Sequence, residues 1–587
     1  MKTINKIANK LLMVCCLGMV TLPYACTDGF EDLNKFPYAP PYEPSGNVDP
    51  DPTPDPFSEI NFAPSVTAEE LADLEGKQAE IGSTFKTFTY EGLANDYQRT
   101  TNLTHDIYAG YFWTNKKEFL VSSPNYVYSE GWSSLRWSHF YKERTTEYQS
   151  LARTFRYVDY AKYKNAFYIT RIYYAYLAAT MSDTYGDLPF KDLVKGLPAA
   201  EKSVYDSQEK VYDLVFKVLA QATDSIKPGQ CEFVFDAADD KCFGGDEAKW
   251  MRFANSLRLN LALRISNADP ARAKLEGEAA MAQPAGLMSS TADRMKTVPR
   301  YAPVEMGGEN AGGEENEIAN CSFRYVDAVM SKDLENAYRG QSAALDPRCT
   351  VCWFKPSPMD MLLLGNENRR TEYTGCPIGS NDINHTSEKY SVLKVNSWED
   401  KTVLRDDYWF GYSREFYWFG YAQSKFCEAE AALRGWAGAN GTPQSLFEEG
   451  IRASISGYYH MSSSVADAYI SGLKIYSGEI DNPFETGDKE GMLEQIITQK
   501  WLASFPNGNE GWADFRRTDY PRLLNVLDNR DANIPMGKFI KRINYPYSEM
   551  DNNSENVPNI NQGTRVWWDV QDTNNAAGER NTPNNFR

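Results

Sequence analysis

Hydrophobic and polar positions along this 587-residue chain alternate mostly at helical spacing. Over residues 211–222, apolar side chains recur three and four positions apart, which places them on one face of a helix. Residues 250–265 repeat the pattern. We expect Asp206 to cap the first of these helices, because its carboxylate can accept backbone amide hydrogens and Glu209, three positions on, can reach back.

A helical hairpin is predicted over residues 419–458. Apolar residues alternate in steps of three and four from 419 to 436, and glycines around Gly438 then interrupt the pattern. Thr442 is a good capping residue, and Pro443 follows at the first helical position, where its missing amide hydrogen costs nothing. The two apolar stripes that flank this break therefore indicate two helices joined by a short loop.

The same stripes predict the fold class. Residues 167–181 and 493–505 carry further helical patterns, whereas strand signals are few and short, residues 121–128 being one. Residues 301–318 and 545–587 have the composition of loops. We expect a mostly α fold of tetratricopeptide-like helical hairpins with long irregular loops and a few short strands, although no strict 34-residue repeat is visible.

The N-terminus has the pattern of an export signal. Lys2 and two further lysines precede residues 11–22, an apolar run too short to span a membrane as a mature helix. Ala25 and Cys26 follow directly, and a small residue before cysteine is similar to a bacterial lipobox. We expect Cys26 to be lipidated; ordinary cleavage or a plain signal anchor are the alternatives.

Three segments follow from this pattern. Residues 1–25 form the lipoprotein signal peptide, residues 26–60 the lipid anchor and proline-rich tether, and residues 61–587 a single helical domain with a loop-rich ligand-binding subregion. The tether includes residues 36–57, which hold eight prolines and favour an extended, semi-rigid spacer. A tail without a spacing role is the alternative. No later stretch is apolar for long enough to cross a membrane.

Charge and motifs exclude several kinds of chemistry. A net charge of −19 repels phosphate backbones, so nucleic acid is not expected as a partner. No HExxH, GxSxG or phosphate-binding GxxxxGK[ST] motif occurs, and Cys349 and Cys352 form a lone CxxC that is weak as a metal site. We predict no catalytic residue, cofactor or metal. A carboxylate pair for glycoside hydrolysis stays open, because 80 acidic residues allow many pairs.

Aromatic residues are abundant and gather in segments without helical pattern. They make up 13% of the chain and crowd residues 108–113, 126–137 and 408–418. Flat rings in loops suit a sugar-binding surface, because the apolar face of a pyranose stacks on a ring while polar groups bind its hydroxyls. For any single ring, core packing is the alternative. The predicted ligand-binding residues are Tyr111, Trp113, Tyr128, Trp132, Trp353 and Trp409.

Several motifs, in order along the chain, resemble the SusD/RagB family of surface lipoproteins. They include DTYGDLPF at 183–190, WMRFANSLRL at 250–259, EAEAALRG at 428–435 and WADFRRTDYP at 512–521. Further matches between about 100 and 550 extend the resemblance over most of the mature chain. Each motif is weak alone, and together they are specific.

The resemblance implies a tetratricopeptide-like helical fold and a lipoprotein anchored through Cys26 at the surface of a Gram-negative outer membrane. It also implies that the protein captures an oligosaccharide, without enzymatic activity, for a SusC-type TonB-dependent transporter over which it acts as a lid. The alternatives are a peptide ligand in the same architecture and a secreted glycoside hydrolase. Arg516 and Arg517 are expected to pair with buried acids.

Overall fold

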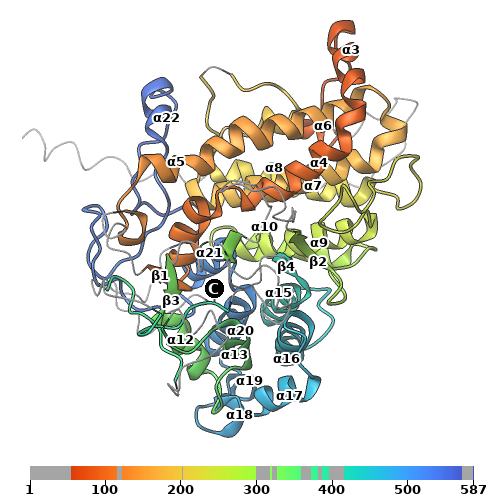
Figure 1. Ribbon diagram of the computed structural model, residues 1–587. Helices are drawn as coiled ribbons and strands as arrows, with labels where there is room; N and C mark the ends of the chain where they lie inside the picture. Colours follow the sequence, from red (N-terminus) through yellow and green to blue (C-terminus); the bar gives the residue numbers. More distant parts are fainter. Residues whose placement is uncertain are drawn as a thin grey trace, which may run out of the picture. The chain divides into compact units, whose positions relative to one another are not determined.

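The computed structural model describes residues 55–114, 122–200, 202–298, 317–319, 321, 327–358, 372–380, 387–394, 415–570 and 586. The chain divides into two compact units, Met1–Asp55 and Pro56–Arg587, and the second holds nearly all described residues (Figure 1). The predicted signal peptide, Cys26, most of the tether and Trp409 lie outside the described residues.

The second unit is mostly helical, which confirms the predicted fold class (Figure 1). None of the helices in the described ranges is both long and apolar enough to cross a bilayer. The helices in chain order are η1 Ser58–Ile60, α3 Ala68–Gly76, η2 Lys77–Glu80, α4 Ile81–Ala94, η3 Gln98–Asp106, η5 Ser123–Asn125, α5 Glu130–Ser138, η6 His139–Arg144, α6 Thr145–Tyr157, α7 Tyr160–Tyr185, η7 Leu193–Lys195, α8 Gln208–Ser225, α9 Glu247–Arg264, α10 Pro270–Ala282, α11 Glu317–Ala319, α12 Lys332–Gly340, α13 Pro347–Cys352, α15 Tyr421–Leu433, α16 Pro443–Arg452, η10 Ala453–Tyr458, α17 Ser463–Ser471, α18 Lys474–Ser477, α19 Pro483–Thr486, α20 Lys489–Ser504, α21 Gly508–Thr518 and α22 Tyr547–Asn552.

Helices that follow one another in the chain often pack side by side. Helix α7 packs against α6 and α8, α9 packs against α8 and α10, and α15 packs against α16 and α20. Nearly every side chain of α7 from Tyr163 onward is buried, because other helices cover it on all sides. This continuous stack forms the rigid part of the domain.

The predicted hairpin is present as α15 and α16. The Thr442 hydroxyl accepts a hydrogen bond from the backbone of Ser445, and Pro443 occupies the first turn, as expected. After Arg452 the chain continues as the π-helix η10, so residues 453–458 have a wider turn than the apolar pattern indicated.

The predicted cap of α8 is wrong by one position. Ser207, not Asp206, caps the helix, and its hydroxyl accepts from the backbone nitrogen of Lys210 at 3.2 Å. The Asp206 carboxylate instead accepts from the backbone nitrogens of Phe190 and Lys191 at 3.0 and 2.6 Å. Asp206 therefore ties the loop after α7 to the start of α8.

Strands are few and short. Strand β1 (Phe112–Thr114) pairs antiparallel with β3 (Ala328–Met330), and β2 (Arg294–Thr297) pairs antiparallel with β4 (Phe416–Gly420). The strand predicted over 121–128 is wrong for its described part, which holds the 3-10 helix η5, where Pro124 cannot donate to a sheet. Helix α22 lies in a region predicted to be loop.

Buried charges connect the helices of the core. Arg517 of α21 donates two hydrogen bonds to Glu430 of α15, at 2.6 and 2.7 Å, as predicted. Arg516 differs from the prediction, because no acid of the described residues lies within ion-pair distance of it and its Nη1 donates to the carbonyl oxygens of Asp183 and Lys541, both at 2.7 Å. Its guanidinium lies 3.6 Å from the ring centre of Trp512.

A second set of buried charges lies beside this pair. Arg264 of α9 contacts both Asp183 and Glu510, and the Lys500 ammonium lies 2.8 Å from the Asp514 carboxylate. Each of these charges is almost fully shielded from solvent and has an opposite charge beside it. Such compensated pairs fix the relative positions of helices, since breaking one leaves an unpaired buried charge.

Candidate functional site

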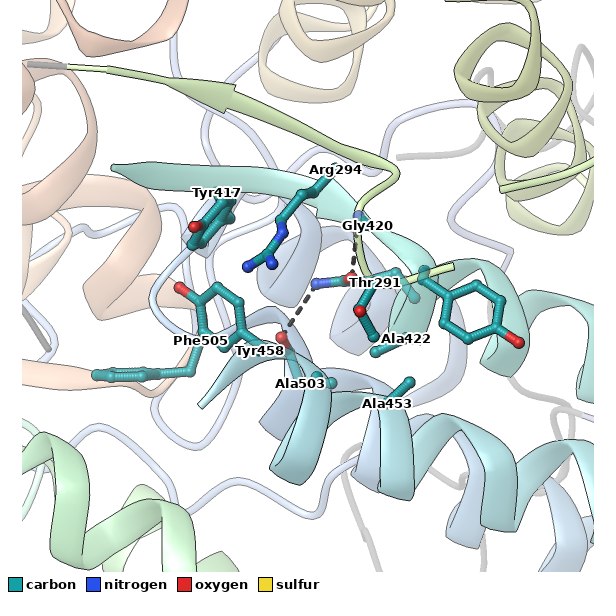
Figure 2. A pocket seen from close by; sticks show the side chains of 12 residues that line it. Thr291, Arg294, Tyr417, Gly420, Ala422, Ala453, Tyr458, Ala503 and Phe505 are labelled. Atoms are coloured by element: carbon teal, nitrogen blue, oxygen red, sulfur yellow. Dashed lines mark hydrogen bonds between the residues drawn. The ribbon is translucent and has the colours of Figure 1, made fainter. Parts of the chain in front are cut away.

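A small pocket, partly open to solvent, lies between the β2–β4 ribbon and helices α15, η10 and α20 (Figure 2). Side chains from all of these elements line it. Those used in the argument below are Thr291, Arg294, Tyr417, Gln423, Tyr458 and Phe505.

Two tyrosines form an aromatic wall of this pocket. The rings of Tyr417 and Tyr458 meet edge to face, with their centres 4.8 Å apart and their planes at 74°. Both side chains are half-buried, so part of each ring faces the pocket. The Tyr417 hydroxyl donates to Glu415, which fixes the orientation of that ring.

Arg294 supplies the principal polar group. It reaches from β2 toward the two tyrosines, and its Cζ lies 4.7 Å from the ring centre of Tyr417 (Figure 2). Its Nη1 is buried and has no hydrogen-bond partner among the described residues. A buried donor without a partner is costly, so this nitrogen is suited to an acceptor brought by a ligand.

Arg294 forms no ion pair with a described residue, although its charge adds to the lowering of the pKa of Glu415. Lys296, two residues along β2, forms an ion pair with Glu415. Burial raises the pKa of Glu415, but hydrogen bonds from Lys296 and Tyr417 outweigh this and hold the pKa below its ordinary value. Glu415 is therefore ionised at neutral pH and engaged with Lys296 and Tyr417.

Local sequence explains the geometry of the pocket. The pairing of β2 with β4 shifts register between Met295 and Lys296, and such a bulge re-aims the side chains beside it. The Gln423 side chain accepts from the Gly420 nitrogen and donates to the Ala503 carbonyl, both at 3.0 Å, which joins β4, α15 and α20 (Figure 2). These bonds hold one side of the pocket rigid.

The π-helix η10 shapes the other side. π-helical turns are rare and are frequent at functional sites. Tyr458 is the last residue of this element, and Gly457 precedes it against Thr291 of the segment before β2. A Cβ on Gly457 would lie 2.1 Å from the Thr291 methyl group, so only glycine fits there without displacement.

The lining favours binding over catalysis. Among the described residues around the pocket, none carries a carboxylate, an imidazole or a thiol. Carboxylates, imidazoles and thiols are the commonest general acids, bases and nucleophiles of enzymes. Aromatic faces beside a guanidinium can instead stack on an amphipathic ring and donate hydrogen bonds to its oxygens.

Cysteine chemistry does not supply a site either. The seven cysteines after Cys26 are free thiols, and all but Cys231 are buried. Burial raises the pKa of Cys352 to about 12, so this thiol of the CxxC motif is neutral and a poor metal ligand. Within the described ranges, no three His, Cys, Asp or Glu side chains are placed to hold a metal ion.

Three of the predicted ligand-binding residues have no exposed ring face in the structure. Tyr111, Trp113 and Trp353 are fully buried. The Tyr111 hydroxyl donates to the Trp501 carbonyl at 2.6 Å, and Trp113 lies in β1, paired with β3. These rings are core residues, because neighbouring helices and strands cover both of their faces.

The buried rings lie directly behind the pocket. Phe505 lines the pocket, and its ring centre lies 5.3 Å from that of Tyr111 and 5.6 Å from that of Trp353. The predicted rings Tyr111 and Trp353 therefore support the pocket wall from behind without facing the pocket.

Two predicted rings remain half-buried, and the pocket does not include them. Tyr128 contacts Tyr547 near the start of α5, and Trp132 lies in the first turn of that helix. Both stay predictions. Sequence reasoning missed Arg294 and Tyr458; the aromatic crowd at 408–418 pointed to Tyr417, whereas nothing in the sequence pattern distinguished Arg294.

Comparisons with known proteins agree with this architecture. The family model described as SusD-like, Susd and RagB outer membrane lipoprotein, matches residues 65–569. No curated protein matches the chain. Solved structures do.

A chitin-binding SusD homologue from Flavobacterium johnsoniae is 30% identical, with a TM-score of 0.65, and the match covers 85% of this chain and 99% of that one. A SusD homologue from Bacteroides uniformis is 25% identical, with a TM-score of 0.65 and coverage of 84% and 99%. One from Bacteroides vulgatus, at 24% identity, has a TM-score of 0.68 and coverage of 84% and 99%. The chain belongs to the SusD-like family of outer-membrane lipoproteins.

Proposed function

We propose that this protein captures an oligosaccharide at the cell surface and passes it, chemically unchanged, to a SusC-type TonB-dependent transporter. The observation that carries the proposal is the pocket in which Arg294 leaves a guanidinium nitrogen unpaired beside the rings of Tyr417 and Tyr458. This combination provides a stacking surface and a charged donor. The described lining holds no carboxylate pair of the kind that glycoside hydrolysis uses.

Chitin fragments are the first ligands to test. The relative with 30% identity is described as chitin-binding, and N-acetylglucosamine has the two features that the pocket complements. Its pyranose ring has an apolar face that can stack on Tyr458, and its acetamido carbonyl can accept from Arg294. A hydrogen bond from a charged donor contributes about 1.5–3 kcal/mol, which makes the arginine the larger of the two contributions.

The predicted N-terminal segments complete the proposal. Residues 1–25 direct export, Cys26 carries the lipid, and residues 26–60 hold the domain of residues 61–587 away from the membrane. A domain on such a tether stays close to a transporter in the same membrane, so transfer needs no diffusion through the medium. Modest affinity suits this role, since tight capture would slow release.

Calorimetric titration of the purified mature chain tests the proposal. Chitohexaose and a panel of plant, host and microbial oligosaccharides are the probes, with a protein digest as competitor. We expect binding of at least one oligosaccharide, weakened at least tenfold by Arg294→Ala and unchanged by Arg522→Ala, which removes an arginine from a surface ion pair with Glu494. Binding of peptides from the digest, with no binding of any oligosaccharide, would assign the pocket to peptides instead.

A second assay separates capture from hydrolysis. The protein is incubated with each bound oligosaccharide, and reducing ends are measured over time. We expect no increase. Release of reducing sugar that a single carboxylate substitution abolishes would identify the protein as a glycoside hydrolase.

A further inference from the structure

A second, larger hollow lies between helix α5, the π-helix η6 and helix α22. It shares no lining residue with the pocket at Arg294. Figure 1 shows α5 and α22 close together, and the backbone nitrogen of Tyr547 donates to Glu130 at 3.0 Å across them. The side chains used in the argument are Glu130, Trp137, Tyr141, Lys142, Glu549 and Asn552.

The floor of this hollow is aromatic and rigid. The Trp137 ring lies 4.5 Å from that of Tyr141, 6.0 Å from that of Tyr205 and 5.5 Å from that of Tyr545, measured between centres. Trp137 is buried, whereas Tyr141 is half-buried and faces the hollow. A ring held by several others loses little side-chain entropy when a ligand stacks on it.

Two carboxylates stand on the rim, each oriented by a tyrosine. Glu130 accepts from the Tyr128 hydroxyl at 2.7 Å, and Glu549 accepts from the Tyr205 hydroxyl at 2.8 Å. Among the described residues, neither carboxylate has a lysine, arginine or histidine within ion-pair distance. Both therefore keep acceptor capacity that a ligand can use.

Donors complete the rim. Lys142 is exposed and forms no ion pair with any described residue, and the Asn552 side chain is exposed beside it in the lining. A polyhydroxylated ring is bound by groups of this kind: oriented acceptors, exposed donors and the accessible face of a half-buried tyrosine. Two carboxylates disfavour an anionic ligand, because like charges repel each other.

We infer that this hollow is a second carbohydrate-binding site, which takes a neutral oligosaccharide. The sugar ring stacks on Tyr141, and its hydroxyl groups donate hydrogen bonds to Glu130 and Glu549. The ligand class rests on the proposed function. The location of the second site is independent of that function, since the hollow shares no side chain with the first pocket. Two sites on one chain allow a polymer to bind with avidity that neither site has alone. Tyr128, a ring predicted from the sequence, takes part by holding Glu130 in place.

Hydrogen exchange and calorimetry of the mature chain test this inference. The probes are chitohexaose, cellohexaose and maltohexaose. In Arg294→Ala, where the first pocket is weakened, we expect the bound hexaose to slow amide exchange in residues 546–553 and in α5. Adding Glu549→Gln, which keeps the side-chain shape, should weaken this remaining binding at least fivefold. Tyr141→Ala should do the same.

The matched control is Tyr476→Ala. Tyr476 also donates its hydroxyl to a glutamate, Glu448 at 3.0 Å, but lies in α18 and lines neither hollow. Calorimetry could instead reveal one binding site, which Arg294→Ala abolishes and Glu549→Gln leaves intact. This result would contradict the second site and leave the proposed function standing. Protection of residues 546–553 by a lysine-rich peptide and by no hexaose would overturn the second site too. Absence of binding by every hexaose would count against both proposals.

Discussion

Arg516 and Arg294, two of the arginines that lie on aromatic rings, differ in how their hydrogen bonds are satisfied. Arg516 lies 3.6 Å from the ring centre of Trp512 in the core, and Arg294 lies 4.7 Å from that of Tyr417 at the pocket. The Arg516 Nη1 donates to two backbone carbonyls, whereas the Arg294 Nη1 has no partner among the described residues. Burial lowers the pKa of Arg516 to about 9, a consequence of full enclosure.

The difference shows how one residue pair can build either scaffold or site. Where the surrounding backbone satisfies every donor, the arginine holds helices together. Where one donor stays unsatisfied beside a half-exposed ring, the same pair is ready to bind a ligand. For these two arginines, hydrogen bonding to the backbone distinguishes the one in the core from the one at the pocket.

The largest expected effect comes from breaking a compensated charge in the scaffold. Arg517→Ala leaves Glu430 buried without its bidentate partner and should lower the free energy of unfolding by about 3–5 kcal/mol. Urea denaturation followed by circular dichroism measures this. Arg522→Ala, which breaks a surface pair, should cost no more than about 1 kcal/mol. Equal losses in the two variants would contradict the distinction between core and surface charges.

Removing a buried ring should also act on stability. Trp353→Ala deletes a fully enclosed side chain and should cost about 3–5 kcal/mol, while the folded variant keeps its affinity for oligosaccharide. Denaturation and calorimetry on the same sample separate the two effects. Lost affinity in a variant of unchanged stability would restore Trp353 as a ligand-binding residue.

Acid should weaken the scaffold through Glu430. Burial raises the pKa of this carboxyl, but Arg517 and Arg434 outweigh it and lower the pKa to about 2. Because the folded-state pKa lies below the unfolded value of about 4.3, the stabilisation is complete above pH 4.3 and is lost as the pH falls toward 2. The loss amounts to about 3 kcal/mol. In Glu430→Gln, unfolding free energy should fall less steeply over this pH range than in the wild type.

At the pocket, substitutions should change affinity and hardly change stability. Arg294→Ala should weaken oligosaccharide binding at least tenfold, because a charged donor contributes about 1.5–3 kcal/mol, and should alter the free energy of unfolding by less than about 0.5 kcal/mol. Calorimetry and thermal denaturation measure the two quantities. A strongly destabilised Arg294→Ala would place this arginine with the scaffold.

The smallest expected effect concerns one ring. Tyr458→Ala should weaken binding about fivefold, since an aromatic contact contributes roughly 1 kcal/mol. Tyr458→Phe keeps the ring and should retain nearly full affinity. If both substitutions had the same effect, the hydroxyl and not the ring face would make the contact.

Local signals predicted the scaffold well. Thr442 and Pro443 mark a helix start through their own backbone chemistry, and periodic apolar positions mark helix faces, so both could be found without knowing the neighbours. The pairing of Arg517 with an acid could be predicted because a buried charge needs an opposite charge beside it. The cap at Ser207 was missed because Asp206 is an equally good acceptor in sequence, and the tertiary contact to the Lys191 backbone engages it elsewhere.

The site was harder to predict for a physical reason. Tyr111 and Tyr458 both stand in tyrosine-rich segments, yet one is enclosed by Trp501 and Phe505 and the other faces a pocket. Burial depends on packing between segments hundreds of residues apart, which periodicity does not report. Arg294 combines a buried nitrogen without a hydrogen-bond partner with a place in the pocket lining, and both properties exist only in the folded chain.

Calorimetric titration of chitohexaose and the wider oligosaccharide panel into wild type and Arg294→Ala tests the central claim most directly. The account predicts heat of binding for the wild type with at least one oligosaccharide, and affinity reduced at least tenfold in the variant at unchanged thermal stability. Equal affinity in the two proteins, or no binding by the wild type across the whole panel, would contradict it.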